Sequence, residues 1–178
     1  MKTLATPSQT ENEAQFDDDA VMEESWPGQN IALAREQLAR EMQQSPDDGK
    51  LSMAAGHLEM SLENFEAARD AFARASRLLP KAAAAHSSLA LACLKLGRRN
   101  EAGQAALRAI ALQPDDATGL KVLARIHLDA GQHEAALMAC QRILRHDRRD
   151  EEARELLGEA KAQKAALAEN IFANKPLL

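Results

Sequence analysis

The chain has 178 residues, and 46% of them are apolar, which is enough for one folded domain with a tail. Only 3% are aromatic, and a core of alanine and leucine suits close helix packing better than a β-sandwich. The net charge of −5 comes from residues 1–28, which hold seven acidic side chains and one lysine. The remainder is close to neutral and gives no electrostatic reason to expect a nucleic-acid partner.

Residues 1–28 show no sustained periodicity and end in Pro27 and Gly28. They offer too little apolar surface to offset the entropy lost on ordering, so we predict an acidic, disordered leader. The leader has no apolar stretch typical of a signal peptide, and no run of about 18 apolar residues occurs in the chain. We therefore expect a cytoplasmic protein with no membrane span.

Apolar residues recur with a helical period from residue 30 onward. Asn30 is the expected N-cap of the first helix, and Asp47 or Asp48 that of the second, with Asp115 and Asp116 in the same role further along. These signals and the intervening turns predict helices over 30–45, 49–61, 65–78, 82–96, 99–112, 116–130, 133–146 and 149–169.

The turns inside the predicted helix pairs carry residues that tolerate a left-handed backbone. Gly97 and Gly131 occupy equivalent places and are expected to end their helices in that conformation. In the first pair the turn is Glu63–Asn64, where Asn64 is expected to take this role.

Small residues and prolines recur every 34 residues. They stand at Ala34, Ala68, Ala102 and Ala136, at Gly56, Ala90, Ala124 and Gly158, and at Pro46, Pro80 and Pro114. Self-similarity at this period indicates a stack of helix–turn–helix units. Two helices approach to about 8 Å only where the contact carries little side chain. We therefore expect the alanine column of the second helices to face the small column of the first helices.

The pattern resembles the tetratricopeptide repeat, which has a small residue in its first helix, alanine in its second and a closing proline. The first full unit matches at Gly56, Ala68, Phe72, Ala75 and Pro80. The resemblance implies an all-α, right-handed α-solenoid. It would occupy 29–170, with full repeats at about 49–82, 83–116 and 117–150, a half-repeat before them, a capping helix over 149–169 and a flexible tail over 171–178.

The chain departs from the family pattern at several positions. Ser52, His86 and Leu120 stand where the first helix often has tryptophan, and Arg148 stands where the earlier units have proline. The small-residue contacts are intact, so we expect the fold to persist.

The resemblance also implies that the first helices line a concave groove that binds a partner. The expected groove residues are Lys50, Met53, His57, Met60, Ser87, Leu91, Leu94, Lys95, Lys121, Arg125 and Leu128. A basic corner at Lys95, Lys121 and Arg125 favours a peptide with apolar anchors and some acidic residues. A shift of one residue in the helical register would instead place the leucines in the core.

No motif in the sequence indicates catalysis, a cofactor or a metal. Cys93 and Cys140 lack metal-ligand spacing and are expected to be buried free thiols. The glutamates of 149–169 read as a solvated helix face. Relatives that clamp the C-terminal carboxylate of heat-shock chaperones use Lys, Asn and Arg at groove positions that here hold Met53, His57, Ser88, Thr118 and Val122.

We therefore predict a non-catalytic adaptor or scaffold for protein–protein interaction, with a secretion-type chaperone as a narrower version. The alternative is a regulatory or targeting subunit of a transferase or of a pilus or cell-envelope assembly. The acidic leader has two possible roles: to keep the protein in solution, or to occupy the basic end of the groove through Asp17–Asp19 with Phe16 and Trp26. The polar capping helix favours a monomer.

Overall fold

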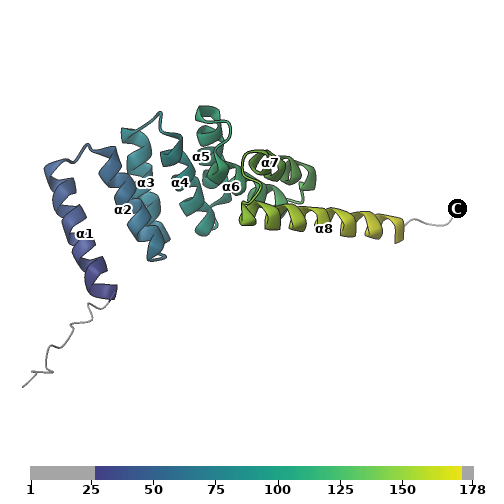
Figure 1. Cartoon of the computed structure of the whole chain (residues 1–178), viewed down its shortest axis with the longest axis horizontal. Coiled ribbons are helices and arrows are strands. Elements are labelled where there is room, and N and C mark those ends of the chain that lie inside the picture. The colour runs from purple at the N-terminus through teal and green to yellow at the C-terminus, as the bar shows by residue number, and fades with distance from the viewer. Residues whose placement is uncertain (1–26, 174–178) are drawn as a thin grey trace, which may run out of the picture.

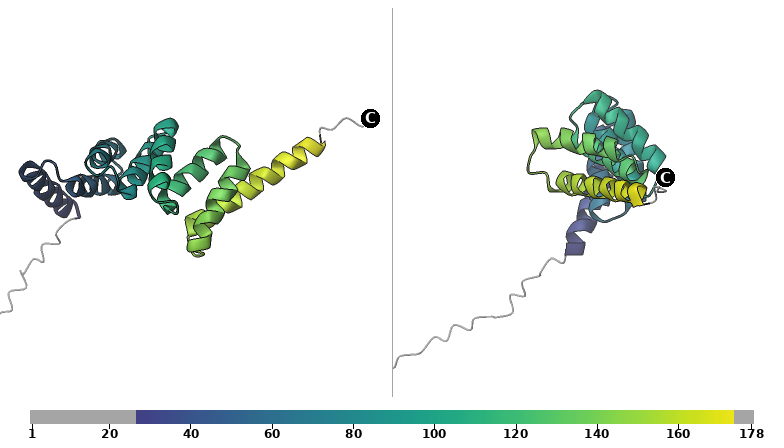
Figure 2. Two further views of the ribbon diagram at one scale, coloured as in Figure 1. Left: turned by 90° about the horizontal axis from the view of Figure 1, so that it is seen from above. Right: turned by 90° about the vertical axis from the view of Figure 1, so that its right-hand side faces the viewer.

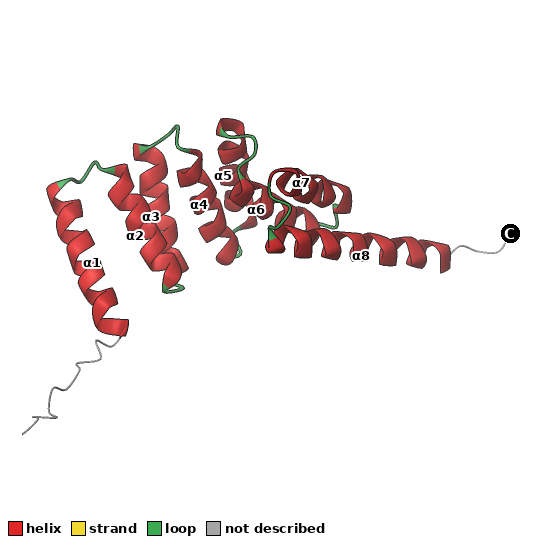
Figure 3. Cartoon of the chain, in the orientation of Figure 1, coloured by secondary structure: helices red, strands yellow, loops and turns green. Residues whose placement is uncertain are grey.

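The structure is a computed structural model, and it describes residues 27–173. Within that range all regular structure is helical (Figure 3). The helices are α1 (Pro27–Gln44), α2 (Gly49–Ser61), α3 (Phe65–Leu78), α4 (Ala83–Lys95), α5 (Arg99–Leu112), α6 (Ala117–Asp129), α7 (His133–His146) and α8 (Glu151–Ala173). Residues 1–26 of the expected leader and 174–178 of the expected tail lie outside the described residues.

The helices pack in chain order as an elongated stack of antiparallel pairs (Figure 1). α2 pairs with α3, α4 with α5 and α6 with α7, and each pair packs against the next. The first helices also touch one another directly, α4 against α6 and α6 against α8. The protein is therefore an all-α solenoid, as predicted. α8 begins as the first helix of a further unit and then runs on beyond α7 (Figure 2).

The small residues form the contacts between helices. Ala90 and Ala102 share one core cluster, and Ala124 and Ala136 share the next. All four are completely buried, which confirms that the two small columns face each other in these units. In the first unit the glycine is required by an aromatic ring, because a Cβ atom on Gly56 would lie 2.4 Å from Cε1 of Phe72.

The ends of the stack depart from this pattern. Gly158 of α8 belongs to the small column, yet it is exposed and a Cβ atom there would meet open space. Ala34 of α1 is half-buried, and no side chain over residues 31–44 is fully buried. Both terminal helices thus bury one face only.

Aspartates cap the first helices of three units. The Asp48 carboxylate accepts the Lys50 N–H at 2.7 Å, and the Asp116 carboxylate accepts the Gly119 N–H at 2.6 Å. A third cap, Asp150 on α8, was not predicted, although it lies 34 residues after Asp116. The expectation for Asn30 is wrong, because α1 begins at Pro27 and proline suits the first turn of a helix.

Three turns contain a left-handed residue at equivalent places. Gly97 has φ 73° and Gly131 has φ 70°, as predicted. In the first unit the left-handed residue is Glu63, with φ 56°, whereas Asn64 has φ −85°. The expectation for Asn64 is therefore wrong by one position, and the 34-residue spacing from Gly97 identifies the correct residue.

Candidate partner-binding groove

The first helices α4, α6 and α8 enclose a cavity of about 330 Å³. Its lining is Leu91, Leu94, Lys95, Gly97, Arg99, Thr118, Lys121, Val122, Arg125, Asp129, Glu152 and Leu156. The structure thus brings together five of the groove residues expected from the sequence, namely Leu91, Leu94, Lys95, Lys121 and Arg125. We call this cavity the α4–α6–α8 groove.

The apolar side chains form the floor of the α4–α6–α8 groove. Val122 and Leu156 are almost completely buried, and Leu91 and Leu94 are half-buried beside them. Leu156 comes from the capping helix, which sequence reasoning treated as solvated; its 34-residue spacing from Val122 is the signal that identifies it. A floor of this kind offers a seat for an apolar side chain of a ligand.

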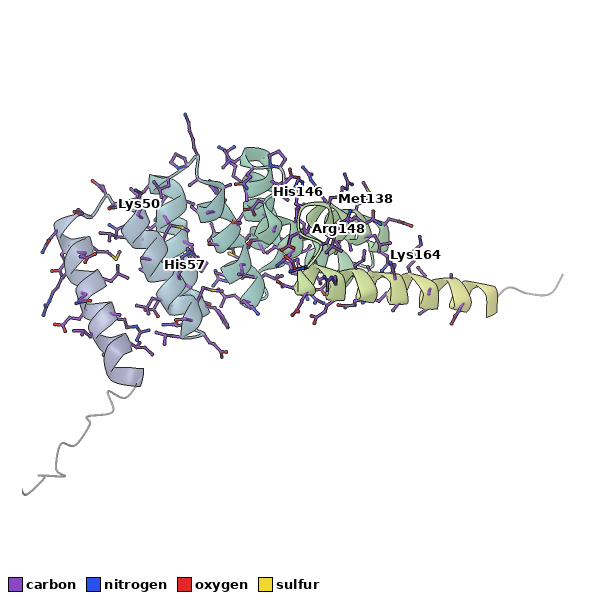
Figure 4. The ribbon with its side chains drawn as sticks, viewed as in Figure 1. Lys50, His57, Met138, His146, Arg148 and Lys164 are labelled. Atoms are coloured by element: carbon purple, nitrogen blue, oxygen red, sulfur yellow. The ribbon has the colours of Figure 1, made fainter. Side chains whose placement is uncertain are left out.

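The expected groove residues of α2 lie outside this cavity, near the other end of the stack. Lys50 and His57 are exposed (Figure 4). The His57 ring meets the Phe72 ring edge to face, with 5.1 Å between the ring centroids. Met53 and Met60 are half-buried against the core cluster that contains Phe72.

Ser87 and Leu128 do not line the groove. Each is only 3% exposed, and the Ser87 hydroxyl donates to the carbonyl of Ala84 within its own helix. Leu128 packs in the same core cluster as Ala136 of α7. Their expected place in the groove is therefore wrong, because the register of each helix turns these side chains into the core.

The basic corner is neutralised by the capping helix. Lys121 Nζ lies 2.8 Å from Asp150 and 3.1 Å from Glu152, and Arg125 lies 2.8 Å from Glu159. The expectation of a purely solvated face is therefore wrong for Glu152 and Glu159. Glu159 stands 34 residues after Arg125, so the repeat spacing itself could have indicated the pair.

The ion pair shifts the ionisation of both partners. Burial works to lower the pKa of Lys121, but hydrogen bonds to Asp150 and Glu152 raise that pKa above its ordinary value. Burial likewise works to raise the pKa of Asp150, and the Lys121 ammonium and the Ala153 N–H together hold it below the ordinary value. Both groups are therefore charged at neutral pH.

Lys95 is the remaining cation at the groove. Its side chain is exposed and makes no ion pair within residues 31–169. Arg99, on the same rim, pairs with Asp129 at 2.8 Å. The groove therefore offers an apolar floor, a balanced charged rim and one unengaged ammonium group.

The chemistry of the described residues is that of a surface. Cys93 and Cys140 are buried free thiols, as predicted, and burial raises the pKa of both, so they stay protonated at neutral pH. No group of three or more His, Cys, Asp or Glu in the part of the chain that the structure describes could hold a metal ion. No helix over residues 27–173 is long and apolar enough to cross a bilayer.

Helix pairs of constant length, small residues at their contacts and a groove along the first helices define a helical repeat protein. Residues 53–117 match the model of the tetratricopeptide repeat family. The match and the helix pairing together identify the chain as a tetratricopeptide repeat protein, with 53–117 as the matched part.

Solved structures of this fold are similar over most of the chain. A crystal structure of MamA superposes with a TM-score of 0.70 at 20% identity, over 80% of this chain and 78% of MamA. The first such domain of human RPAP3 gives 0.63 at 16% identity, over 68% and 96%. The yeast Sti1 TPR2B domain, in a complex with pHsp70, gives 0.59 at 20% identity, over 65% and 97%. No protein of curated function matches significantly in sequence.

Proposed function

We propose that the chain is a non-catalytic adaptor that binds a peptide segment of a protein partner in the α4–α6–α8 groove. The observation that carries this proposal is the apolar floor, in which Leu91 and Leu94 leave part of their surface uncovered beside the cavity. Peptide binding by neighbours of the same fold supports it, since a domain of RPAP3 is bound to an HSP90 peptide.

The charges of the groove define the preferred segment. An apolar side chain would sit between Leu91 and Leu94, with a carboxylate of the ligand near Lys95. A strongly acidic peptide is disfavoured, because it would have to displace Glu152 and Glu159 from Lys121 and Arg125. This narrows the ligand that the sequence alone suggested.

A secretion-type chaperone in the cytoplasm is the narrower form of this proposal, and a regulatory or targeting subunit is its alternative. The carboxylate clamp of chaperone-binding relatives is not expected here, because Val122, at one of the clamp positions, is 1% exposed and belongs to the core. An unfolded client would support the chaperone form, and a folded enzyme the subunit form.

The groove is tested by selecting peptides from a random library on the immobilised full chain. We expect an apolar residue flanked by an acidic one in the selected peptides. Lys95→Glu should lower their affinity about tenfold by placing like charges together. Thr118→Arg should do so by filling the cavity.

Met138→Glu is the matched control, because Met138 is 69% exposed on α7 and does not line the groove (Figure 4). Its affinity should equal that of the parent, and helicity should be unchanged in all three variants. Selected peptides that bind Lys95→Glu and Thr118→Arg as tightly as the parent would exclude the groove as the binding site.

A further inference from the structure

The turn between α7 and α8 carries a concentrated positive patch outside the groove. Arg145, Arg148 and Arg149 are all exposed, within five residues of one another (Figure 4 labels Arg148 and His146). We call these three residues the arginine patch. Arg148 stands where the two preceding units have proline, so the patch replaces the residue that closes those units.

The surrounding carboxylates are engaged elsewhere. Asp115 pairs with Arg142 at 3.0 Å and with His146 at 3.3 Å, and Asp150 pairs with Lys121. Asp147 accepts the backbone N–H of Arg149 at 2.9 Å. None of the three guanidinium groups of the patch makes an ion pair with a residue between 31 and 169. The patch is thus a site of uncompensated positive charge on a nearly neutral body.

A shallow hollow lies within the patch. Gln141, Leu144, Arg145 and Arg148 surround about 370 Å³ of open space. Leu144 is half-buried and gives the hollow an apolar base, while the two arginines stand at its edge. Such a surface fits an aromatic or aliphatic side chain followed by carboxylates, because guanidinium groups bind both carboxylates and ring faces.

The chain itself contains a segment of that chemistry. Residues 11–24 carry seven acidic side chains and no basic one, and Phe16 directly precedes Asp17, Asp18 and Asp19. We infer that this acidic segment docks on the arginine patch of the same molecule, with Phe16 over Leu144 and the three aspartates on the arginines. This proposal is independent of the function proposed for the groove.

The tether makes the intramolecular contact favourable. The 26 residues before α1 can span up to about 90 Å when extended, which is many times the spacing of about 8–10 Å between packed helices. A tethered segment has an effective concentration of the order of millimolar, so a weak charge-driven contact is populated. The groove is the poorer target, because Lys121 and Arg125 already have carboxylate partners.

Zero-length carbodiimide cross-linking of the full chain tests the proposal. The variant R145K/R148K/R149K keeps the charge and supplies amines that couple to carboxylates. We expect cross-links from residues 11–24 to positions 145–149 in the monomer band, at least threefold more frequent than to Lys50 or Lys81. These native lysines are exposed, so they are internal controls. Raising NaCl to 0.5 M should abolish the preference by screening.

A second measurement uses the arginines in their native form. A protease specific for glutamate should cut at Glu11, Glu13, Glu23 and Glu24 at least threefold faster in R145Q/R148Q/R149Q than in the parent, because the leader is released. Arg77→Gln, at an exposed arginine of α3, should leave the rate unchanged. Leader cross-links spread evenly over all lysines, concentrated on Lys95 or confined to a dimer band would overturn the proposal, as would equal cleavage rates.

Discussion

The left-handed residues of the three turns show how single positions differ in cost. Glycine adopts a positive φ readily, whereas a residue with a Cβ atom pays about 1–2 kcal/mol there. Gly97 and Gly131 satisfy this demand, and Glu63 does not. Glu63 is exposed and makes no ion pair with the other described residues, so no contact offsets its strain.

Glu63→Gly should therefore stabilise the protein. We expect the free energy of unfolding to rise by about 0.5–1 kcal/mol, since relief of the strain exceeds the entropy that a new glycine adds to the unfolded chain. Urea unfolding followed by circular dichroism measures it. Gly97→Ala is the reciprocal control and should lower stability by about 1 kcal/mol. A loss of stability in Glu63→Gly would mean that Glu63 has a favourable interaction of its own.

Residue-scale features were predictable wherever the 34-residue spacing applies. The caps Gly97 and Gly131 and the buried thiols followed from sequence. Asn64 was chosen over Glu63 on residue preference, and the repeat register then proved the better guide. Ser87 and Leu128 were misplaced because a rotation of one residue about a helix axis decides whether a side chain faces the groove or the core.

Contacts between helices depend on side chains of minimal size. Ala102 of α5 is completely buried in the cluster that contains Ala90 of α4. Interiors are packed as densely as crystals, so three extra carbon atoms at such a contact must displace a neighbour. The helix pair thus depends on the absence of side-chain volume at this position.

Ala102→Leu should lower the free energy of unfolding by about 1–3 kcal/mol through overpacking. Ala111→Leu makes the same chemical change at an exposed position of the same helix and should change stability by less than about 0.5 kcal/mol. Thermal and urea unfolding of both variants provide the comparison. If both variants melt with the parent, the α4–α5 contact is looser than described.

The capping helix is attached by charge as well as by apolar contact. The pKa of Asp150 is held below its ordinary value in the folded protein, so the carboxylate contributes stability above the ordinary pKa of about 4. That contribution is lost as the pH falls through the lower, folded value. The stability of the native protein should therefore fall more steeply between about pH 5 and pH 3 than that of Asp150→Asn.

Asp150→Asn isolates the charge, because asparagine caps a helix nearly as well as aspartate. Urea unfolding at several pH values in this window measures the difference in slope. Glu155→Gln, an exposed change on the same helix, controls for general titration of the carboxylates. Parallel curves for the parent and Asp150→Asn would contradict the assigned pair between Lys121 and Asp150.

At the scale of the whole molecule, each unit touches only its neighbours. Successive units are joined at the surface by ion pairs such as Arg98–Glu66 at 3.2 Å and Arg99–Asp129 at 2.8 Å. Exposed pairs of this kind contribute up to about 1 kcal/mol each, so apolar contacts carry most of the cohesion. Stability should then be nearly additive along the stack and lowest at its ends.

Hydrogen exchange should show this gradient. Over residues 31–44, α1 has no fully buried side chain, whereas α4 and α5 contain three or more each. We expect the amides of α1 to exchange at least tenfold faster than those of α4 and α5, because local opening exposes little apolar surface there. Mass spectrometry of peptides from the full chain gives the comparison. Uniform protection along the stack would indicate a single cooperative unit instead.

The stack as a whole was predictable, and the electrostatics of the groove were not. Periodicity is a local property of the sequence, and it specified the helices and their pairing. The neutralisation of Lys121 and Arg125 depends on how α8 crosses α6, which is a tertiary relation. The repeat spacing between Arg125 and Glu159 was visible in the sequence, but charge alone did not show that the two would meet.

Gly158 leaves a bare patch of backbone on α8 that meets only open space. The architecture consequently has no built-in terminator, and its length is a matter of copy number. Splicing a duplicate of 117–150 in front of α8 would give a longer rod whose joints already exist, and it would lengthen the binding track by one module without any redesign of the parts.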